Sequence, residues 1–488
     1  MALDTSPKFD TDGGERPTAV VVAVQLPDVT DEELGSSIAE LERLGKTLGL
    51  DIVGRITQRR AKLAPGVVLG EGKLRELATW TGGSGVVEAY SKPGRRRRDA
   101  GADAAADDDE EEDDDGEDAN EDGAEDEDAD DTGGPGAAAR APGDRSSASV
   151  VLVDHDLTPT QQRNLEKATG ADVLDRTSVI LEIFHRHAKT REARLQVEIA
   201  RLRYLAPRLR ESGGGGDRVR GGVGGKGAGE SALELDRRRI RDRIAELRHE
   251  LDQIEGGSQT RRARRSELPT VALVGYTNAG KSSLMRALTS TEVYVADKLF
   301  ATLDTTVRRL QPPTEPPILV TDTVGFIKKL PHDLVASFRS TLEEAAGADL
   351  LLHVIDASDP AHPDQIAVTR EVLAEIGADA VPAWLLLNKI DRVTETERAA
   401  LADRYPGAHQ LSAKDRGDVA ALRERLIAEL AGALEEAELV VPWTAQRIVH
   451  QIHERTTVLA EEHDEAGTRL RVRAPAKILD DLRAALRT

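Results

Sequence analysis

The chain has 488 residues, which corresponds to about three domains of ordinary size. It contains no cysteine, so a disulfide framework and any thiolate metal site are excluded. The net charge of −22 is misleading, because residues 99–131 alone carry 21 acidic side chains and no Lys or Arg, which leaves the rest of the chain at −1. The folded parts of the chain can therefore carry basic surfaces.

Residues 1–17 are polar and contain no apolar signal core, so we expect them to form a disordered tail. The longest apolar runs, such as AVVVAV at 19–24, have only the length of a strand. We therefore expect no membrane span and a cytoplasmic location, with peripheral membrane association left open.

Residues 18–188 are predicted to form an N-terminal α/β domain with a mostly parallel sheet, because strand patterns alternate with helix patterns. Thr30 is the expected N-cap of the first helix. The expected strands are 18–26, 50–58, 85–90, 149–154 and 171–175, and the expected helices are 30–48, 72–80 and 157–169.

Residues 92–148 interrupt this domain with Gly, Ala, Asp, Glu, Pro and Ser, and RRRR lies at 95–98. Such a composition buries too little apolar surface to fold, so we predict a disordered insertion in a surface loop. Two interpretations remain open. The insertion is a solvated linker, or it covers a basic surface until RNA displaces it.

Residues 189–260 are predicted to form an antiparallel helical hairpin. One long helix is expected over 178–210, followed by a glycine-rich loop at 212–229 and a second helix over 231–256. The second helix carries apolar residues at coiled-coil spacing. RRARR at 261–265 is interpreted as a basic linker. A second α/β domain is expected at 267–436, and a small C-terminal α/β domain at 437–488.

GYTNAGKS at 275–282 has the form GxxxxGKS and lies between an expected strand and an expected helix. This is the pattern of a phosphate-binding loop, in which Lys281 contacts the β- and γ-phosphates and Ser282 coordinates magnesium. The predicted phosphate-binding residues are Gly275, Tyr276, Thr277, Asn278, Ala279, Gly280, Lys281 and Ser282.

Three further motifs predict that the nucleotide is GTP. NKID at 388–391 follows an apolar strand, and its Asn and Asp side chains match the hydrogen-bonding edge of guanine, whereas adenine would leave the carboxylate without a partner. SAK at 412–414 offers a backbone amide to guanine, and DTVG at 322–325 offers a magnesium-side carboxylate and an amide for the γ-phosphate. The residues are Asn388, Lys389, Ile390, Asp391, Ser412, Ala413, Lys414, Asp322, Thr323, Val324 and Gly325.

LFATLDTTVRRL at 299–310 lies where the first switch is expected, and Thr302, Thr305 and Thr306 all qualify chemically as a magnesium ligand. DTVG is followed by Phe326, where many GTP-hydrolysing proteins place a glutamine that orients the attacking water. Phenylalanine cannot do this. We therefore expect slow turnover by the isolated chain and a partner that completes the switch.

The sequence resembles the HflX GTPases, relatives of the Obg group. The resemblance covers most of the chain outside 1–17 and 92–148. It rests on VLGEGKLREL at 68–77, the long segment 157–209, GAGESALELDRRRI at 227–240, the phosphate-binding loop and FATLDTT. It implies that Thr302 is the magnesium ligand of the first switch. The implied first-switch residues are Phe300, Ala301, Thr302, Leu303 and Asp304, and the implied catalytic residues are Lys281, Thr302 and Gly325.

The resemblance also implies partners. Members of the family bind the large ribosomal subunit, reach ribosomal RNA with the N-terminal domain and hairpin, and dissociate stalled or idle ribosomes, often under stress. In related GTPases an asparagine at the position of Asn278 helps to bind K⁺, although Asn278 could equally serve only to shape the loop. The chain departs from the family at GAGE (227–230), where the family usually has GPGE, and in its acidic insertion.

Two rival functions remain at the level of sequence. An NTP-driven RNA-remodelling enzyme would need a second nucleotide site in the N-terminal domain, for which VLGEGKL at 68–74 is the one hint. A non-ribosomal regulatory switch would bind another protein in its GTP form. For the ribosome-associated GTPase that the resemblance implies, we expect Mg²⁺ as cofactor and a monomer away from the ribosome.

Overall fold

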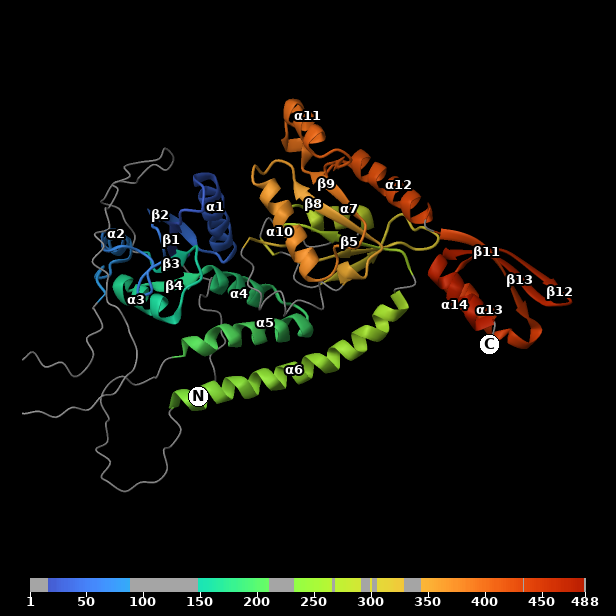
Figure 1. Cartoon of the computed structure of the whole chain (residues 1–488), viewed down its shortest axis with the longest axis horizontal. Coiled ribbons are helices and arrows are strands. Elements are labelled where there is room, and N and C mark those ends of the chain that lie inside the picture. The colour runs from blue at the N-terminus through green and yellow to red at the C-terminus, as the bar shows by residue number, and fades with distance from the viewer. Residues whose placement is uncertain are drawn as a thin grey trace, which may run out of the picture.

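The computed structural model describes residues 16–87, 148–209, 232–265, 268–290, 299–300, 305–328, 344–432 and 434–486. Three sheets follow one another along the chain, and a helical hairpin connects the first sheet to the second (Figure 1). The predicted fold class, a multidomain α/β protein with a mostly parallel nucleotide-binding sheet, is confirmed.

The first sheet is parallel, with the strand order β2-β1-β3-β4. The inner strand β1 is apolar and buried along almost its whole length, as expected of a parallel sheet covered on both faces. Thr30 caps the first helix in a capping box with Glu33, as predicted. The elements are β1 Thr18–Gln25, α1 Asp31–Thr47, β2 Asp51–Arg59, α2 Glu71–Thr81, β3 Val150–Val153, α3 Pro159–Thr169 and β4 Asp172–Asp175.

The expected strand at 85–90 is wrong for residues 85–87, which form no strand; residues 88–90 lie outside the described residues. Gly85 adopts a positive φ of 67°, and its amide donates to the carbonyl of Ala168 rather than to a neighbouring strand. β3 occupies the place beside β1 instead. The acidic insertion also lies outside the described residues, apart from Ala148.

The single helix expected over 178–210 is two helices, α4 Arg176–His187 and α5 Arg191–Leu205, followed by the 3₁₀ turn η1 Ala206–Arg208. Ala188 leaves the helical conformation at ψ 109°, and Thr190 starts the next helix by accepting a hydrogen bond from the amide of Ala193. A threonine that can cap a helix end competes locally with a continuous helix, which the apolar spacing did not reveal.

α5 packs along α6 Ala232–Arg265 through an apolar seam (Figure 1). The two helices are antiparallel, since Arg191 pairs with Glu250 and Glu198 pairs with Arg243. The seam residues are Leu195, Ile199, Leu202, Ile240 and Leu247. α6 continues through 261–265, so the predicted basic linker is wrong: these residues are helical. The glycine-rich loop, GAGE included, lies outside the described residues.

The second sheet has the order β10-β9-β8-β5-β7-β6 and is parallel except for β6. Its elements are β5 Thr270–Val274, α7 Lys281–Thr289, β6 Thr306–Arg309, β7 Leu319–Asp322, β8 Leu350–Asp356, α10 His362–Glu375, β9 Ala383–Asn388, η2 Ile390–Arg392, α11 Glu395–Arg404, β10 His409–Gln410 and α12 Arg416–Gly432.

The third sheet is antiparallel, with the order β11-β13-β12, and two helices cover it. Its elements are β11 Leu434–Pro442, η3 Trp443–Ala445, α13 Arg447–Arg455, β12 Thr457–Asp464, β13 Gly467–Pro475 and α14 Ala476–Leu486. Among the described helices, none combines the length and apolarity that crossing a membrane requires.

Candidate nucleotide site

The phosphate-binding loop runs from the end of β5 to the start of α7, at the carboxyl edge of the second sheet. Gly275 has a φ of 141°, and a Cβ there would lie 2.1 Å from the carbonyl oxygen of Val354. Gly280 has a φ of 100° and starts α7 without any side-chain cap. These two glycines are therefore required by the backbone, and the uncapped N–H groups of α7 are left to bind an anion.

Lys281 is buried beneath this loop, and its Nζ donates to the carbonyls of Gly275 and Tyr276, both at 2.9 Å. Burial lowers the pKa of Lys281 to about 8, and the nearby Asp322 carboxylate partly opposes this shift. A buried cation fixed by two carbonyls is well placed to bind phosphate oxygens, because the phosphate charge would compensate the cost of burial.

Ser282 and Asp322 face each other across the start of α7 and the end of β7. The Ser282 hydroxyl donates to Asp322 Oδ2 at 2.8 Å. A hydroxyl and a carboxylate are the hard oxygen ligands that Mg²⁺ prefers, so this pair fits a magnesium ion. The described residues contain no cluster of three His, Asp or Glu side chains that could hold a metal, so such an ion would depend on nucleotide oxygens and water for its other ligands.

The segment after β7, DTVG followed by Phe326, is hydrogen-bonded to the phosphate-binding loop. Thr277 N–H donates to the carbonyl of Phe326 at 2.8 Å, and Phe326 N–H donates to the carbonyl of Gly275 at 3.1 Å. A Cβ on Gly325 would lie 3.0 Å from Lys281 Nζ. The structure thus brings Gly325 and Lys281 together, on the side of the loop where a terminal phosphate would bind. Thr323 and Val324 are buried between them and β7.

Asn388 joins the NKID and SAK segments to the phosphate-binding loop. Its amide donates to the carbonyl of Ala279 at 2.8 Å and accepts from the amide of Ala413 at 3.0 Å. Lys389 Nζ donates to the carbonyl of Asn278 at 2.6 Å and pairs with Asp356. The NKID, SAK and phosphate-loop segments, which are far apart in the sequence, therefore form one connected structure.

Asp391 lies at the end of this structure with its carboxylate held by Ser412, whose hydroxyl donates at 2.6 Å. This hydrogen bond is the main reason that the pKa of Asp391 is lowered. Ser412 Oγ also accepts from the amide of Lys414 at 3.3 Å. An ionised, oriented carboxylate suits the two N–H donors of guanine. Ile390 is buried beneath it.

The first switch is only partly described. Leu299 and Phe300 are buried, and the Phe300 ring packs edge-on against Phe184 of α4 at 4.6 Å. Thr306 begins β6 opposite Asp322. Ala301, Thr302, Leu303 and Asp304 lie outside the described residues, so the choice among the three threonines stays a prediction.

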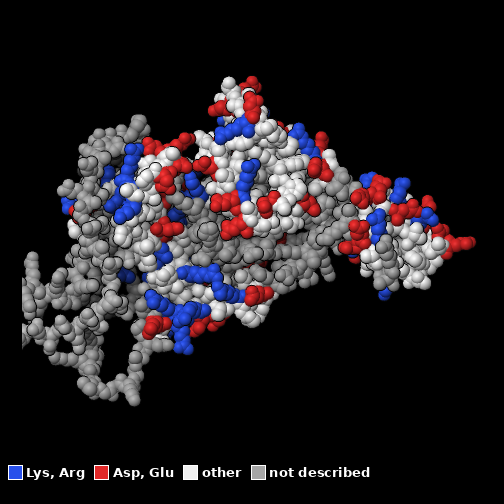
Figure 2. All heavy atoms as spheres, viewed as in Figure 1, with Lys and Arg blue, Asp and Glu red and all other residues white. Residues whose placement is uncertain are grey.

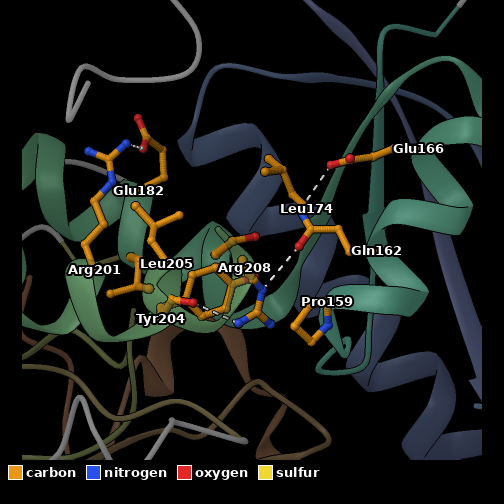
Figure 3. A pocket seen from close by; sticks show the side chains of 11 residues that line it. Pro159, Gln162, Glu166, Leu174, Glu182, Arg201, Tyr204, Leu205 and Arg208 are labelled. Carbon is orange, nitrogen blue, oxygen red and sulfur yellow. Dashed lines mark hydrogen bonds and ion pairs between the residues drawn. The ribbon is translucent and has the colours of Figure 1, made fainter. Parts of the chain in front are cut away.

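A separate pocket of about 290 Å³ lies in the N-terminal region, between α3, α4 and α5 (Figure 3). Its cationic groups are already paired. Arg208 donates to Gln162 and Asp175 and stacks on Tyr204, and Arg201 pairs with Glu182. None of the residues 68–74 lines it. VLGEGKL therefore has no connection to this pocket, and the hint of a second nucleotide site gains no support from it.

Sequence reasoning missed a buried polar group beside the phosphate-binding loop, formed by Ser37, Glu40, Asp154, Arg176 and the side chain of Tyr276. One weak signal existed. Asp154 directly follows the apolar run VVLV, and Arg176 directly follows the strand pattern ADVLD, where polar residues often serve a site at the sheet edge. Their pairing could not be read from the sequence.

A phosphate-binding strand–loop–helix, hydrogen-bonded through Asn388 to the NKID and SAK segments, makes this chain a P-loop GTPase. That is the class of protein that the fold and the site define.

Comparison with known proteins narrows the class. Residues 35–87 and 137–185 match the family model "GTP-binding GTPase N-terminal", 187–265 match "GTP-binding GTPase Middle Region", and 270–389 match "50S ribosome-binding GTPase". A protein named GTPase HflX from Gluconacetobacter diazotrophicus is 55% identical over 95% of this chain and 96% of its own length. The chain belongs to the HflX GTPase family.

Two further matches have lower sequence identity. The GTPase HflX of Escherichia coli is 42% identical over 68% of this chain and 79% of its own length. Among solved structures, a GTP-binding protein of Sulfolobus solfataricus in complex with GDP is 21% identical, covers 85% of this chain and 99% of its own, and has a TM-score of 0.40.

Proposed function

We propose that this GTPase associates with the large ribosomal subunit and dissociates stalled or idle ribosomes, with GTP favouring the bound state and hydrolysis permitting release. The observation that carries the proposal is the match of its GTPase region to a model described as a 50S ribosome-binding GTPase, within a chain of the HflX family. The ribosome, its RNA and stress-linked splitting are thus the expected partner and role, and a cytoplasmic location follows from them.

The surface of the hairpin supports an RNA partner. Lys and Arg side chains gather over α5 and α6 in Figure 2, although acidic side chains lie among them. Arg237, Arg239 and Arg241 are exposed along one stretch of α6. Basic side chains on an extended helical arm suit contact with phosphates, because neutralising each phosphate releases bound counterions.

Within the nucleotide site, we assign roles by chemistry. Lys281 binds the β- and γ-phosphates, and the Gly325 amide meets the γ-phosphate. Ser282 and Thr302 would hold Mg²⁺, with Asp322 acting through water; when bound, the ion would neutralise charge developing on the phosphates. Asn388, Asp391 and the amide of Ala413 bind guanine. The Ser282–Asp322 contact at 2.8 Å supports the metal assignment.

The Phe326 ring is buried, so neither its chemistry nor its position allows it to orient water. Slow turnover by the isolated chain and stimulation by a partner that orders the switch follow from this. Asn278 is the exposed fourth residue of the loop, and its side chain would share in binding K⁺. A potassium ion there would supply positive charge near the transferred phosphoryl group.

Sucrose-gradient analysis of intact ribosomes tests this proposal. Adding the chain with a non-hydrolysable GTP analogue should convert whole ribosomes into subunits and leave the chain in the large-subunit fractions. GDP should abolish both effects, and Asp391→Ala should do the same with the analogue. Ribosomes that stay intact, with the chain remaining at the top of the gradient, would instead support a regulatory switch with a different partner.

A further inference from the structure

The N-terminal region and the phosphate-binding loop meet at a group of buried polar side chains. Glu40 lies on α1, Asp154 follows β3, Arg176 begins α4, and Tyr276 is the second residue of the phosphate-binding loop. Each is 5% exposed or less. Buried polar groups are costly unless paired, so the pairing in this group specifies how the two regions fit together.

Arg176 is the centre of the group. Its Nη1 pairs with Asp154 at 2.7 Å, its Nη2 pairs with Glu40, and its Nε donates to the backbone carbonyl of Lys328 at 3.2 Å. Burial lowers the pKa of Arg176 to about 10, which leaves it a cation at neutral pH. One N-terminal side chain thus holds the backbone just after the DTVGF segment.

The hydroxyl of Tyr276 holds the same residue from the other side. It accepts a hydrogen bond from Lys328 N–H at 2.6 Å and donates its own proton to Glu40. The directions are fixed, because a backbone N–H can only donate and the phenol must therefore give its proton to the carboxylate. Burial raises the pKa of Tyr276 to about 12, so the hydroxyl stays protonated.

Lys328 is therefore held at both its N–H and its carbonyl. Three residues earlier, Gly325 lies against Lys281, and between them Phe326 is bonded to the phosphate-binding loop through its own N–H and carbonyl. We call residues 322–328 the second switch. Fixing both Phe326 and Lys328 fixes the path of this segment. The amide of Gly325 is thereby kept in place relative to Lys281 before any nucleotide binds.

We propose that Tyr276, Glu40 and Arg176 are positioning residues for GTP hydrolysis, through which the N-terminal region holds the second switch in place. Preorganised donors assist hydrolysis because they need no rearrangement when charge develops on the phosphate. The proposal goes beyond ribosome binding and rests only on the GTPase class. It also means that a partner bound to the N-terminal region would be connected physically to the second switch.

The test is Tyr276→Phe in the full chain, which keeps the ring but removes the acceptor of Lys328 N–H. We expect kcat without ribosomes to fall about tenfold, equivalent to about 1.4 kcal/mol in the barrier. The affinity for a fluorescent GDP analogue should stay within about twofold, since GDP lacks the phosphate that Gly325 would meet. The split between kcat and GDP affinity separates positioning from a general loss of structure.

Tyr204→Phe is the matched control. Tyr204 also has a partly buried phenol that donates to a carboxylate, Asp175 at 2.7 Å, but it lies on α5, outside the phosphate-binding loop. The kcat of the Tyr204→Phe variant should equal that of the unaltered chain. An equal fall in both variants would overturn the proposal, because it would trace the effect to lost stability.

Arg176→Lys supplies a second variant, which keeps a cation near Glu40 and Asp154 but removes the Nε–H that bonds to Lys328. It should also lower kcat while GDP affinity is kept. Glu40→Gln alone should lower kcat as well, because Glu40 pairs with both Tyr276 and Arg176. An unchanged or increased kcat in Tyr276→Phe would overturn the proposal; an increase would show that the contact restrains the switch.

Discussion

Phe326 shows how a single residue links the nucleotide site to the rest of the protein. Its ring is 1% exposed and belongs to an apolar cluster that also contains Phe300, Phe184 and Ile180. The residue that replaces the usual water-orienting glutamine therefore serves as packing between the GTPase region and the N-terminal region. Its backbone, rather than its side chain, contacts the phosphate-binding loop.

Phe326→Gln should consequently destabilise the chain and should not rescue turnover. Replacing a buried ring by an unpaired amide should lower the free energy of unfolding by about 3 kcal/mol. Urea unfolding measures this, with Phe326→Leu as an apolar control that should lose less than about 1.5 kcal/mol. A stable glutamine variant with strongly increased turnover would contradict both the buried ring and the need for a partner.

Lys281 predicts a dependence of stability on pH. Its pKa falls from 10.5 in the unfolded chain to about 8 in the fold, so between these values the unfolded state binds more protons. The free energy of unfolding of the nucleotide-free chain should therefore rise with pH across this window, by up to about 3 kcal/mol, and be unaffected by Lys281 below it. Lys281→Met should lack the rise, as urea unfolding from pH 7 to 10 would show. An identical profile in the variant would refute the buried, depressed lysine.

At the residue level, the motifs correctly indicated which segments lie together, because each motif is a short local segment at the end of a strand. The phosphate-binding loop, DTVG, NKID and SAK all lie together, at the edge of the second sheet. The contacts of Arg176 and Tyr276 could not be predicted, because their partner Glu40 is 136 and 236 residues away in the sequence. Only the packing of the two regions brings them together.

Among the elements, helices were predicted reliably where a cap and an apolar stripe agree, as for α1 with Thr30. The division of α4 from α5 was missed, because Thr190 starts a new helix within a continuous apolar pattern. The extent of α6 was underestimated, because the arginine-rich residues 261–265 resemble a linker. Arginine is nevertheless a good helix former, and the helix continues through them.

The hairpin seam offers a test at this scale. Leu247 on α6 is fully buried against α5, whereas Leu235 on the same helix is 40% exposed. Leu247→Ala should cost about 2–4 kcal/mol and speed hydrogen exchange of α6 amides, while Leu235→Ala should cost less than about 0.5 kcal/mol. GDP affinity should not change in either. Equal exchange in the two variants would show that the helices are not packed through this seam.

The N-terminal region and the GTPase region share one core. A single apolar cluster contains Leu41 and Ile180 from the N-terminal region together with Tyr276 and Phe326 from the GTPase region. Packed cores do not deform continuously, so a displacement of the N-terminal region would also move the second switch. A partner that binds the N-terminal region and the basic hairpin would therefore be able to control GTP hydrolysis. Sequence alone predicted these regions but not their shared core.

The most direct test of this account is GTP hydrolysis in potassium buffer, with and without purified large ribosomal subunits. We predict that saturating subunits raise kcat at least tenfold, about 1.4 kcal/mol in the barrier, because the ribosome supplies the ordering that Phe326 cannot. The stimulation should weaken as salt rises, as expected for contacts with RNA phosphates. A rate unchanged by large subunits at every salt concentration would contradict the ribosomal role and leave a GTPase whose partner is another molecule.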